Sequence, residues 1–243
     1  MSSSSGTSDG TIYDEKTNEP LPRSFDPKLS DLHWRLDSKD LVFADHAKRV
    51  CRFRIIHPNR NTVEIDWSSI VIHIDGASRG NGYQNARAGW GVFVGDNSPH
   101  NARGTIPPHF QQTNNIAEIE ALSQALDIIQ EIVIDARDYA VRRIYILTDS
   151  EYVVKCLTLW WAKWMANGGI NAAGKPVAHL EKLREIQDRM DNMERAGVVQ
   201  RRIKLCHIRR ERNTRADALA NLALDESQVP GVHSGYASIG FLM

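Results

Sequence analysis

The stretch SIVIHIDGA at residues 69–77 sets one acidic side chain in a run of β-branched residues. In a strand, alternate side chains point to opposite faces, so Val71, His73 and Asp75 share one face while three isoleucines share the other. Ordinary surface acids avoid such a position, because a carboxylate beside a buried run needs a partner or a function. The stretch therefore predicts a strand that carries Asp75 into a Gly-rich turn.

Strand and helix patterns alternate along the chain after this stretch. Short β-branched runs predict further strands at 88–94, 102–106, 143–147 and 201–208. Apolar residues at spacings of three and four predict helices at about 114–132, 151–166, 176–196 and 213–224. This order of elements is typical of an α/β domain.

The regions on either side of this domain lack such patterns. Residues 1–30 mix Ser, Gly, Pro and charged residues, so we expect a disordered tail that can be deleted without loss of function. Residues 31–68 hold short apolar pieces among basic residues and predict an extension of unknown role, either an edge hairpin or a packed arm. Residues 226–243 predict a loose C-terminal tail.

Composition limits the class of protein. The 30 basic and 30 acidic residues cancel, so any site for a polyanion has to come from local clustering. Cys51, Cys156 and Cys206 are far apart, which argues against a zinc site or a disulfide framework and favours a reducing compartment. The Ser-rich start does not resemble a signal peptide, and no apolar run reaches membrane-spanning length. We therefore expect an intracellular protein of the nucleus or cytoplasm, without a membrane partner.

Four acids stand at unusual places: Asp75, Glu118, Asp149 and Asp217. Glu118 is in phase with the apolar stripe of its helix, Asp149 follows a strand, and Asp217 lies beside the apolar face of the last helix. Taken singly, each also fits an ordinary role as a turn residue, a helix cap or a solvated acid. If the strands of Asp75 and Asp149 are neighbours, the carboxylates converge beyond the carboxyl edge of the sheet. Such a cluster needs cations, and its oxygen ligands favour Mg²⁺ or Mn²⁺ over zinc.

The residues that flank these acids form an ordered series of short motifs. The series reads DGA at 75–77, GNG at 80–82, TNN at 113–115, AE at 117–118, TDS at 148–150, GKPV at 174–177 and ADALA at 216–220. His207 precedes Asp217 by ten residues. Each motif alone is common, but the complete series resembles a cellular ribonuclease H type 1 domain, of the eukaryotic kind with a handle region, over residues 69–225.

This resemblance implies a ribonuclease H-like fold, in which helices flank a five-stranded mixed sheet. It implies that Asp75, Glu118, Asp149 and Asp217 bind two Mg²⁺ ions, for which Mn²⁺ can substitute. The implied reaction is cleavage of the RNA strand of an RNA/DNA hybrid, leaving a 5′-phosphate and a 3′-hydroxyl. His207 matches a mobile histidine that assists product release or proton transfer, although a strand-end histidine without chemistry would look the same.

The resemblance also implies contacts with nucleic acid around the metal ions. Asn81 and Asn114 match residues that contact the minor groove of the hybrid, where 2′-hydroxyls distinguish RNA from DNA, and Asn115 lies beside them. Thr113 falls in a pocket for a phosphate of the DNA strand. We therefore expect these four polar residues to bind the substrate.

The handle region is less complete. Trp160 and Trp164 match the aromatic surface that packs along the DNA strand, although stacked core tryptophans would give the same pattern. Gly169 and Ile170 replace an aromatic and a basic residue of the family, and residues 209–212 read RRER where the family has a Gly-rich loop. We expect weaker contact at the handle, while the basic loop provides either phosphate contacts or a solvated face.

Two other functions are compatible with the same fold. One is a noncatalytic hybrid-binding domain, and the other is a ribonuclease H module of a retroelement. Retention of all four acids favours catalysis, and the handle favours a cellular enzyme. The expected partner is an RNA/DNA hybrid, with the chain acting as a monomer without an obligate protein partner, and a share in mitochondria stays open.

Overall fold

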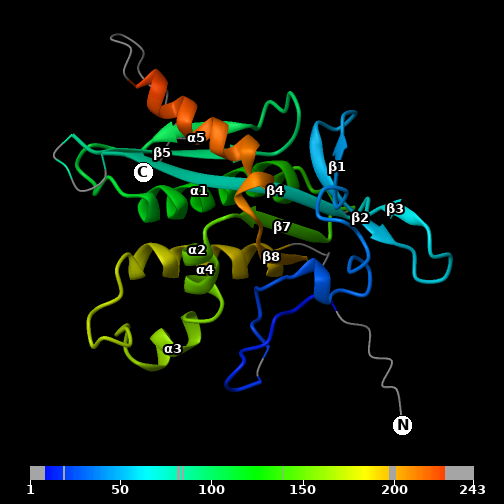
Figure 1. Cartoon of the computed structure of the whole chain (residues 1–243), viewed down its shortest axis with the longest axis horizontal. Helices are drawn as coiled ribbons and strands as arrows, with labels where there is room; N and C mark the ends of the chain where they lie inside the picture. The colour runs from blue at the N-terminus through cyan, green and yellow to red at the C-terminus, as the bar shows by residue number, and fades with distance from the viewer. Residues whose placement is uncertain are drawn as a thin grey trace.

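A mixed sheet with helices on both faces forms the centre of the molecule (Figure 1). The computed structural model describes residues 9–18, 20–80, 83, 85–138, 140–196 and 201–227. The strands are β1 (Val42–Asp45), β2 (Val50–Ile56), β3 (Val63–Ile65), β4 (Ser69–Arg79), β5 (Arg87–Phe93), β6 (Ala102–Thr105), β7 (Arg143–Thr148) and β8 (Arg202–His207). The α-helices are α1 (Asn114–Ile129), α2 (Glu151–Leu157), α3 (Trp161–Ala166), α4 (Leu180–Arg195) and α5 (Thr214–Glu226). Short helical turns are η1 (Pro27–Leu29), η2 (Gln130–Asp135) and η3 (Arg210–Arg212).

Strand β4 lies at the centre of the sheet. It pairs antiparallel with β5, which pairs with β6, and on its other edge it pairs parallel with β7, which pairs with β8. Because β4, β7 and β8 run in one direction, their carboxyl ends meet at the same edge of the sheet. The expected α/β fold, a ribonuclease H-like arrangement with a mixed sheet flanked by helices, is confirmed for these five strands.

The segment before the domain adds three further strands. β1 and β3 both pair antiparallel with β2, and β2 meets β4 where Cys51 lies opposite Val71. Strand β5 ends at Phe93, opposite His73, so β2 takes up the part of the β4 edge that β5 leaves open. Within the described residues the sheet therefore has eight strands in place of the expected five, and the extension is part of it.

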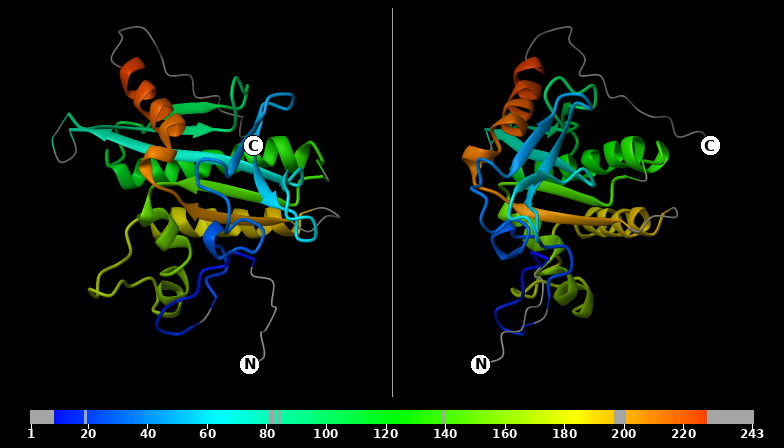
Figure 2. Two further views of the ribbon diagram at one scale, coloured as in Figure 1. Left: turned by 45° about the vertical axis from the view of Figure 1, so that its right-hand side comes forward. Right: turned by 90° about the vertical axis from the view of Figure 1, so that its right-hand side faces the viewer.

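Two hydrophobic cores lie on the two faces of this sheet. Helices α1 and α4 cover one face, and α5 lies on the other (Figure 2). On the α5 face, Phe25 and Phe53 pack their rings against Tyr145 of β7, with centroid distances of 4.7 and 4.5 Å. The residues that precede β4 in the chain thus cover β7 and β8 on this face of the sheet.

The disordered tail expected for residues 1–30 is wrong for its described parts, residues 9–18 and 20–30, which pack on the domain. Phe25 is only 2% exposed, and its N–H donates to the carbonyl of Leu205 in β8 at 3.0 Å. Arg23 is also buried, with its guanidinium bonded to Gln187 and Asp191 of α4. Residues 1–8 and 228–243 lie outside the described residues.

No helix in the described part of the chain has the length and apolar character needed to cross a membrane.

Candidate active site

Three of the four predicted acids converge at the carboxyl edge of the sheet. Asp75 lies in β4, Glu118 lies in the second turn of α1, and Asp149 follows the last residue of β7. Each offers a carboxylate oxygen, and these oxygens all lie within 4.8 Å of one another. The parallel pairing of β4 with β7 thus brings the carboxylates of Asp75 and Asp149 together, as the sequence analysis predicted.

A glycine explains how Glu118 reaches the sheet. A Cβ atom at Gly76 would lie 2.3 Å from the backbone nitrogen of Glu118, so only glycine at this position lets α1 lie so close to β4. Thr113 caps α1, since its Oγ1 accepts a hydrogen bond from the N–H of Ile116 at 3.4 Å. Glu118 is 8% exposed, and the Thr148 hydroxyl donates to its carboxylate at 3.4 Å.

Asn213 holds Asp149 in place, and the sequence analysis missed this role. Its Nδ2 donates to Oδ1 of Asp149 at 2.7 Å and to the carbonyl of Ile74 at 2.9 Å. The backbone carbonyl of Asn213 accepts the N–H of Asp217 at 3.0 Å, so this residue, which is 1% exposed, links β4, the end of β7 and α5. The sequence analysis placed Asn213 only as the first residue of the last helix, and nothing in the local pattern indicated a contact with Asp149.

The fourth acid, Asp217, stands apart from this group of three. It lies in the first turn of α5, and the guanidinium of Arg210 contacts its Oδ1 at 3.3 Å. A Cβ atom at Gly91 would lie 2.5 Å from the carbonyl of Ala216, so this glycine permits the close approach of α5 to the sheet. Asp217 is still near enough to act electrostatically on Asp75.

Burial and like charges alter the titration of this cluster. Burial, followed by the charges of Asp149 and Asp217, raises the pKa of Asp75 to about 8. Burial, followed by the charges of Asp75 and Asp149, also raises the pKa of Glu118 well above its usual range. In the absence of a cation the cluster therefore holds protons at neutral pH, and a cation has to displace them. A set of carboxylate oxygens fits a hard divalent ion such as Mg²⁺ or Mn²⁺.

His207 lies at the same edge of the sheet but outside the cluster. It is the last residue of β8, its side chain is exposed, and it stands in register with Thr148 of β7. Its charged form would act on Glu151 at the start of α2. This position allows a mobile side chain at the rim of the acidic site.

The polar residues expected to contact nucleic acid lie at the start of α1. Thr113 is its cap, and Asn114 and Asn115 are exposed in its first turn. Asn81, the remaining one, lies outside the described residues. The first turn of α1 thus presents exposed amide groups one turn before Glu118.

The two tryptophans expected in the handle lie around α3. The rings of Trp160 and Trp164 are 5.6 Å apart, and both are half-buried against the core on the α1 face. Each ring therefore contributes to packing and keeps an accessible part. This placement is compatible with both interpretations of the two tryptophans, contact with the DNA strand and packing in the core.

Comparison with known proteins places this site in a family. Residues 68–225 match the family model of RNase H. Ribonuclease H1 of Mus musculus is 29% identical over 136 residues, which cover 56% of this chain and 45% of that protein. Ribonuclease HI of Streptomyces coelicolor is 36% identical over 122 residues, which cover 50% of this chain and 47% of that protein. Ribonuclease H of Alkalilimnicola ehrlichii is 33% identical over 157 residues, which cover 65% of this chain and 95% of that protein.

The matched region is thus less than half of the first two relatives and nearly all of the third. Among solved structures, the crystal structure of LC11-RNase H1 in complex with RNA/DNA hybrid is 30% identical, with a TM-score of 0.45, and the match covers 65% of this chain and 99% of that one. The family model alone spans well over half of the chain and includes all four predicted acids. This chain therefore belongs to the type 1 ribonuclease H family.

Proposed function

We propose that this protein is an endonuclease that hydrolyses the RNA strand of RNA/DNA hybrids with two Mg²⁺ ions, leaving a 5′-phosphate and a 3′-hydroxyl. The observation that carries the proposal is the convergence of Asp75, Glu118 and Asp149 within 4.8 Å, inside the segment that matches the family. Such a cluster of like charges is unfavourable without a cation, which supports a role in metal binding.

The residues of the site divide into ligands and supporting groups. Asp75, Glu118 and Asp149 would hold the cations, and Asp217 would join them by exchanging its contact with Arg210. Divalent cations bound there supply an activated water and stabilise the charge on the leaving oxygen. Asn213 keeps the carboxylate of Asp149 directed at the cluster through its 2.7 Å hydrogen bond.

The surroundings of the cluster fit a nucleic acid strand. Asn114 and Asn115 are exposed at the start of α1, and the amide groups of such residues can bond to base edges and 2′-hydroxyls. Trp160 and Trp164 offer partly exposed rings on the handle. His207, at the rim, can deliver a proton to the departing strand or help to release it.

The proposal also concerns the state of the chain in the cell. We take it to act as a monomer in the nucleus or cytoplasm. The three cysteines are free and buried, which supports a reducing compartment.

The test is cleavage of a labelled RNA/DNA hybrid with Mg²⁺ and with a chelator, beside duplex DNA and duplex RNA of the same sequence. We expect cleavage of the RNA strand of the hybrid only, dependent on Mg²⁺, with product ends that accept 3′ extension without phosphatase treatment. Folded protein that binds the hybrid in Ca²⁺ but never cuts it in Mg²⁺ would instead be a noncatalytic hybrid-binding domain.

A further inference from the structure

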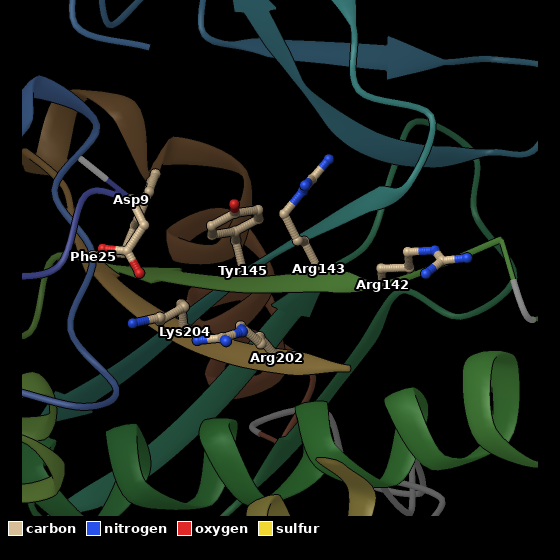
Figure 3. Close-up of a pocket in the computed structure, with 7 residues that line it drawn as sticks. All are labelled: Asp9, Phe25, Arg142, Arg143, Tyr145, Arg202 and Lys204. Atoms are coloured by element: carbon tan, nitrogen blue, oxygen red, sulfur yellow. The ribbon is translucent and has the colours of Figure 1, made fainter. Parts of the chain in front are cut away.

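A second candidate site lies at the amino ends of β7 and β8, at the other end of the strands from the acidic cluster. A cavity of about 340 Å³ opens there on the α5 face of the sheet. Figure 3 shows Arg143 and Tyr145 on β7 next to Arg202 and Lys204 on β8, with Asp9 and Arg142 at opposite ends of the group. Phe25, which belongs to the segment before the domain, also lines the cavity.

The strand register brings like charges together in this cavity. Arg143 stands directly beside Arg202, and Tyr145 stands directly beside Lys204, on adjacent parallel strands. Like charges at directly paired positions destabilise a sheet. The lining contains four cationic side chains, including Arg142, against the single carboxylate of Asp9.

Two of these cations already have partners. Arg143 forms a two-pronged ion pair with Asp66, both N–O distances being 2.8 Å. Among the described residues, the ammonium of Lys204 donates to three uncharged oxygens, those of Thr11, Pro22 and Ser24, at 2.9 to 3.3 Å. Its charge is therefore hydrogen-bonded but not neutralised by a bonded carboxylate, and burial lowers the pKa of Lys204.

The other two cations are free to bind a ligand. Arg142 and Arg202 are exposed, and within the described residues neither guanidinium makes a hydrogen bond or an ion pair. They sit at the entry of neighbouring strands, where the N–H of Arg202 donates to the carbonyl of Arg142 at 2.9 Å. In Figure 3 the guanidinium of Arg202 points toward Lys204 and that of Arg142 points away from it. Because both side chains are exposed and their backbones are hydrogen-bonded neighbours, rotation of the two side chains can bring both guanidiniums to one anion without a change of fold.

We propose that this cavity binds a phosphate group, held by Arg142 and Arg202, with Lys204 supplying additional positive charge from the floor. A guanidinium binds phosphate oxygens in a two-pronged geometry. A phosphate has enough oxygens for two guanidiniums at once, whereas a carboxylate has only two oxygens in all. Tyr145 borders the cavity, and burial raises the pKa of its hydroxyl, so this group stays a neutral donor. The phosphate can come from a free nucleotide or from the end of a nucleic acid strand.

Binding of three probes in metal-free buffer tests this proposal: inorganic pyrophosphate, a nucleoside diphosphate, and a short single-stranded DNA with a 5′-phosphate. Without a divalent cation the acidic cluster repels all three, so it does not contribute to the binding, and the variants below isolate the part due to the cavity. We expect at least one probe to bind the parent and to raise its Tm. The double variant Arg142→Gln, Arg202→Gln should bind that probe about tenfold more weakly or worse.

Two matched variants sharpen the test. Arg184→Gln removes an exposed arginine of α4 and should bind the probe like the parent. Asp9→Asn removes the only carboxylate of the lining while keeping an oxygen to accept the N–H of Thr11, and it should bind more tightly. The Tm of the double variant without ligand should equal or exceed that of the parent, because repulsion is relieved.

The proposal fails if no probe binds the parent, or if the double variant and Arg184→Gln weaken binding equally. It also fails if the double variant melts well below the parent without ligand, since Arg142 and Arg202 would then be structural. The source of the phosphate follows from the probes that the double variant binds more weakly. A loss for all three probes indicates a general phosphate site. A loss for the nucleoside diphosphate alone indicates a nucleotide site, and a loss for the oligonucleotide alone indicates a site for a strand end. Hybrid cleavage is a separate readout, so failure of the proposed nuclease activity would not affect this result.

Discussion

The two ends of β7 and β8 carry opposite charge. At the carboxyl end, Asp149 lies with Asp75 and Glu118, and the pKa values of the last two are raised. At the amino end, Arg143 and Arg202 lie in register on adjacent strands, and both line the cavity that also contains Lys204. Each end holds like charges that repel one another, so each is completed by a ligand of the opposite sign, a cation at one end and an anion at the other.

The two ends also differ in which part of the chain builds them. The acidic end comes entirely from residues 68–225, the segment that matches the family. The basic end needs Asp9 and Phe25 from the N-terminal segment to close it. The domain thus provides the strands for both ends, whereas only the acidic one is complete without the segment that precedes it.

The largest effect is expected at the acidic end, from Asp149→Asn. This change keeps the oxygen that accepts from Asn213 and removes one negative charge, so hybrid cleavage should disappear while the metal-free Tm stays equal or rises. Mg²⁺ should stabilise the variant much less than the parent. Cleavage assays and paired thermal melts with and without Mg²⁺ give the answer.

Asp188→Asn, an exposed change on α4, is the matched control for Asp149→Asn and should behave like the parent. Retained cleavage in Asp149→Asn, or a metal-free Tm far below that of the parent, would show that the carboxylate of Asp149 has a structural role and not a catalytic one.

The next largest effect is expected from His207→Ala. The side chain is exposed, so the variant should fold and bind Mg²⁺ normally. Turnover should fall by about 10² to 10⁴-fold, the usual contribution of a proton-transfer group, and should not vanish. Single-turnover and multiple-turnover rates distinguish proton transfer from product release. Rates equal to those of the parent in both assays would leave His207 without a chemical role.

At the basic end, Phe25→Ala should cost about 3 to 5 kcal/mol of unfolding free energy, because it leaves a cavity against Tyr145 and Phe53. Urea unfolding measures the loss. Leu29→Ala, at a side chain that is 47% exposed, is the control and should cost far less. Equal stability of the Phe25 variant and the parent would restore the expectation that residues 1–30 are a dispensable tail.

The smallest effect concerns pH. The pKa of Asp75 is about 8 in the folded chain and near 3.8 in the unfolded one, so between these values the folded chain holds a proton that the unfolded chain has lost. This group therefore makes the metal-free protein less stable as pH rises from about 4 to 8. Asp75→Asn should flatten the fall in Tm over this range, and Asp188→Asn should not. An unchanged slope in Asp75→Asn would mean that the carboxyl group titrates normally.

Some elements could be predicted from the sequence with nearly correct bounds, and others could not. The strand expected at 143–147 is β7, Arg143–Thr148, because its β-branched run is local information. Helix α4 begins at Leu180, later than the expected start at 176, because His179 adopts a left-handed conformation with φ of 60° directly before it. Such a backbone kink depends on neighbours in space and leaves no trace in periodicity.

The sequence by itself determined the alternation of strands and helices and the choice of acids, since both follow from side-chain type at short spacing. Only the tertiary structure decided that Asn213 holds Asp149, that Asp217 turns to Arg210, and that Phe25 packs on Tyr145. The first and third of these contacts join residues far apart in the chain, and the second joins the η3 turn to α5. Their energies arise only after the sheet has formed, and local composition carries no record of them.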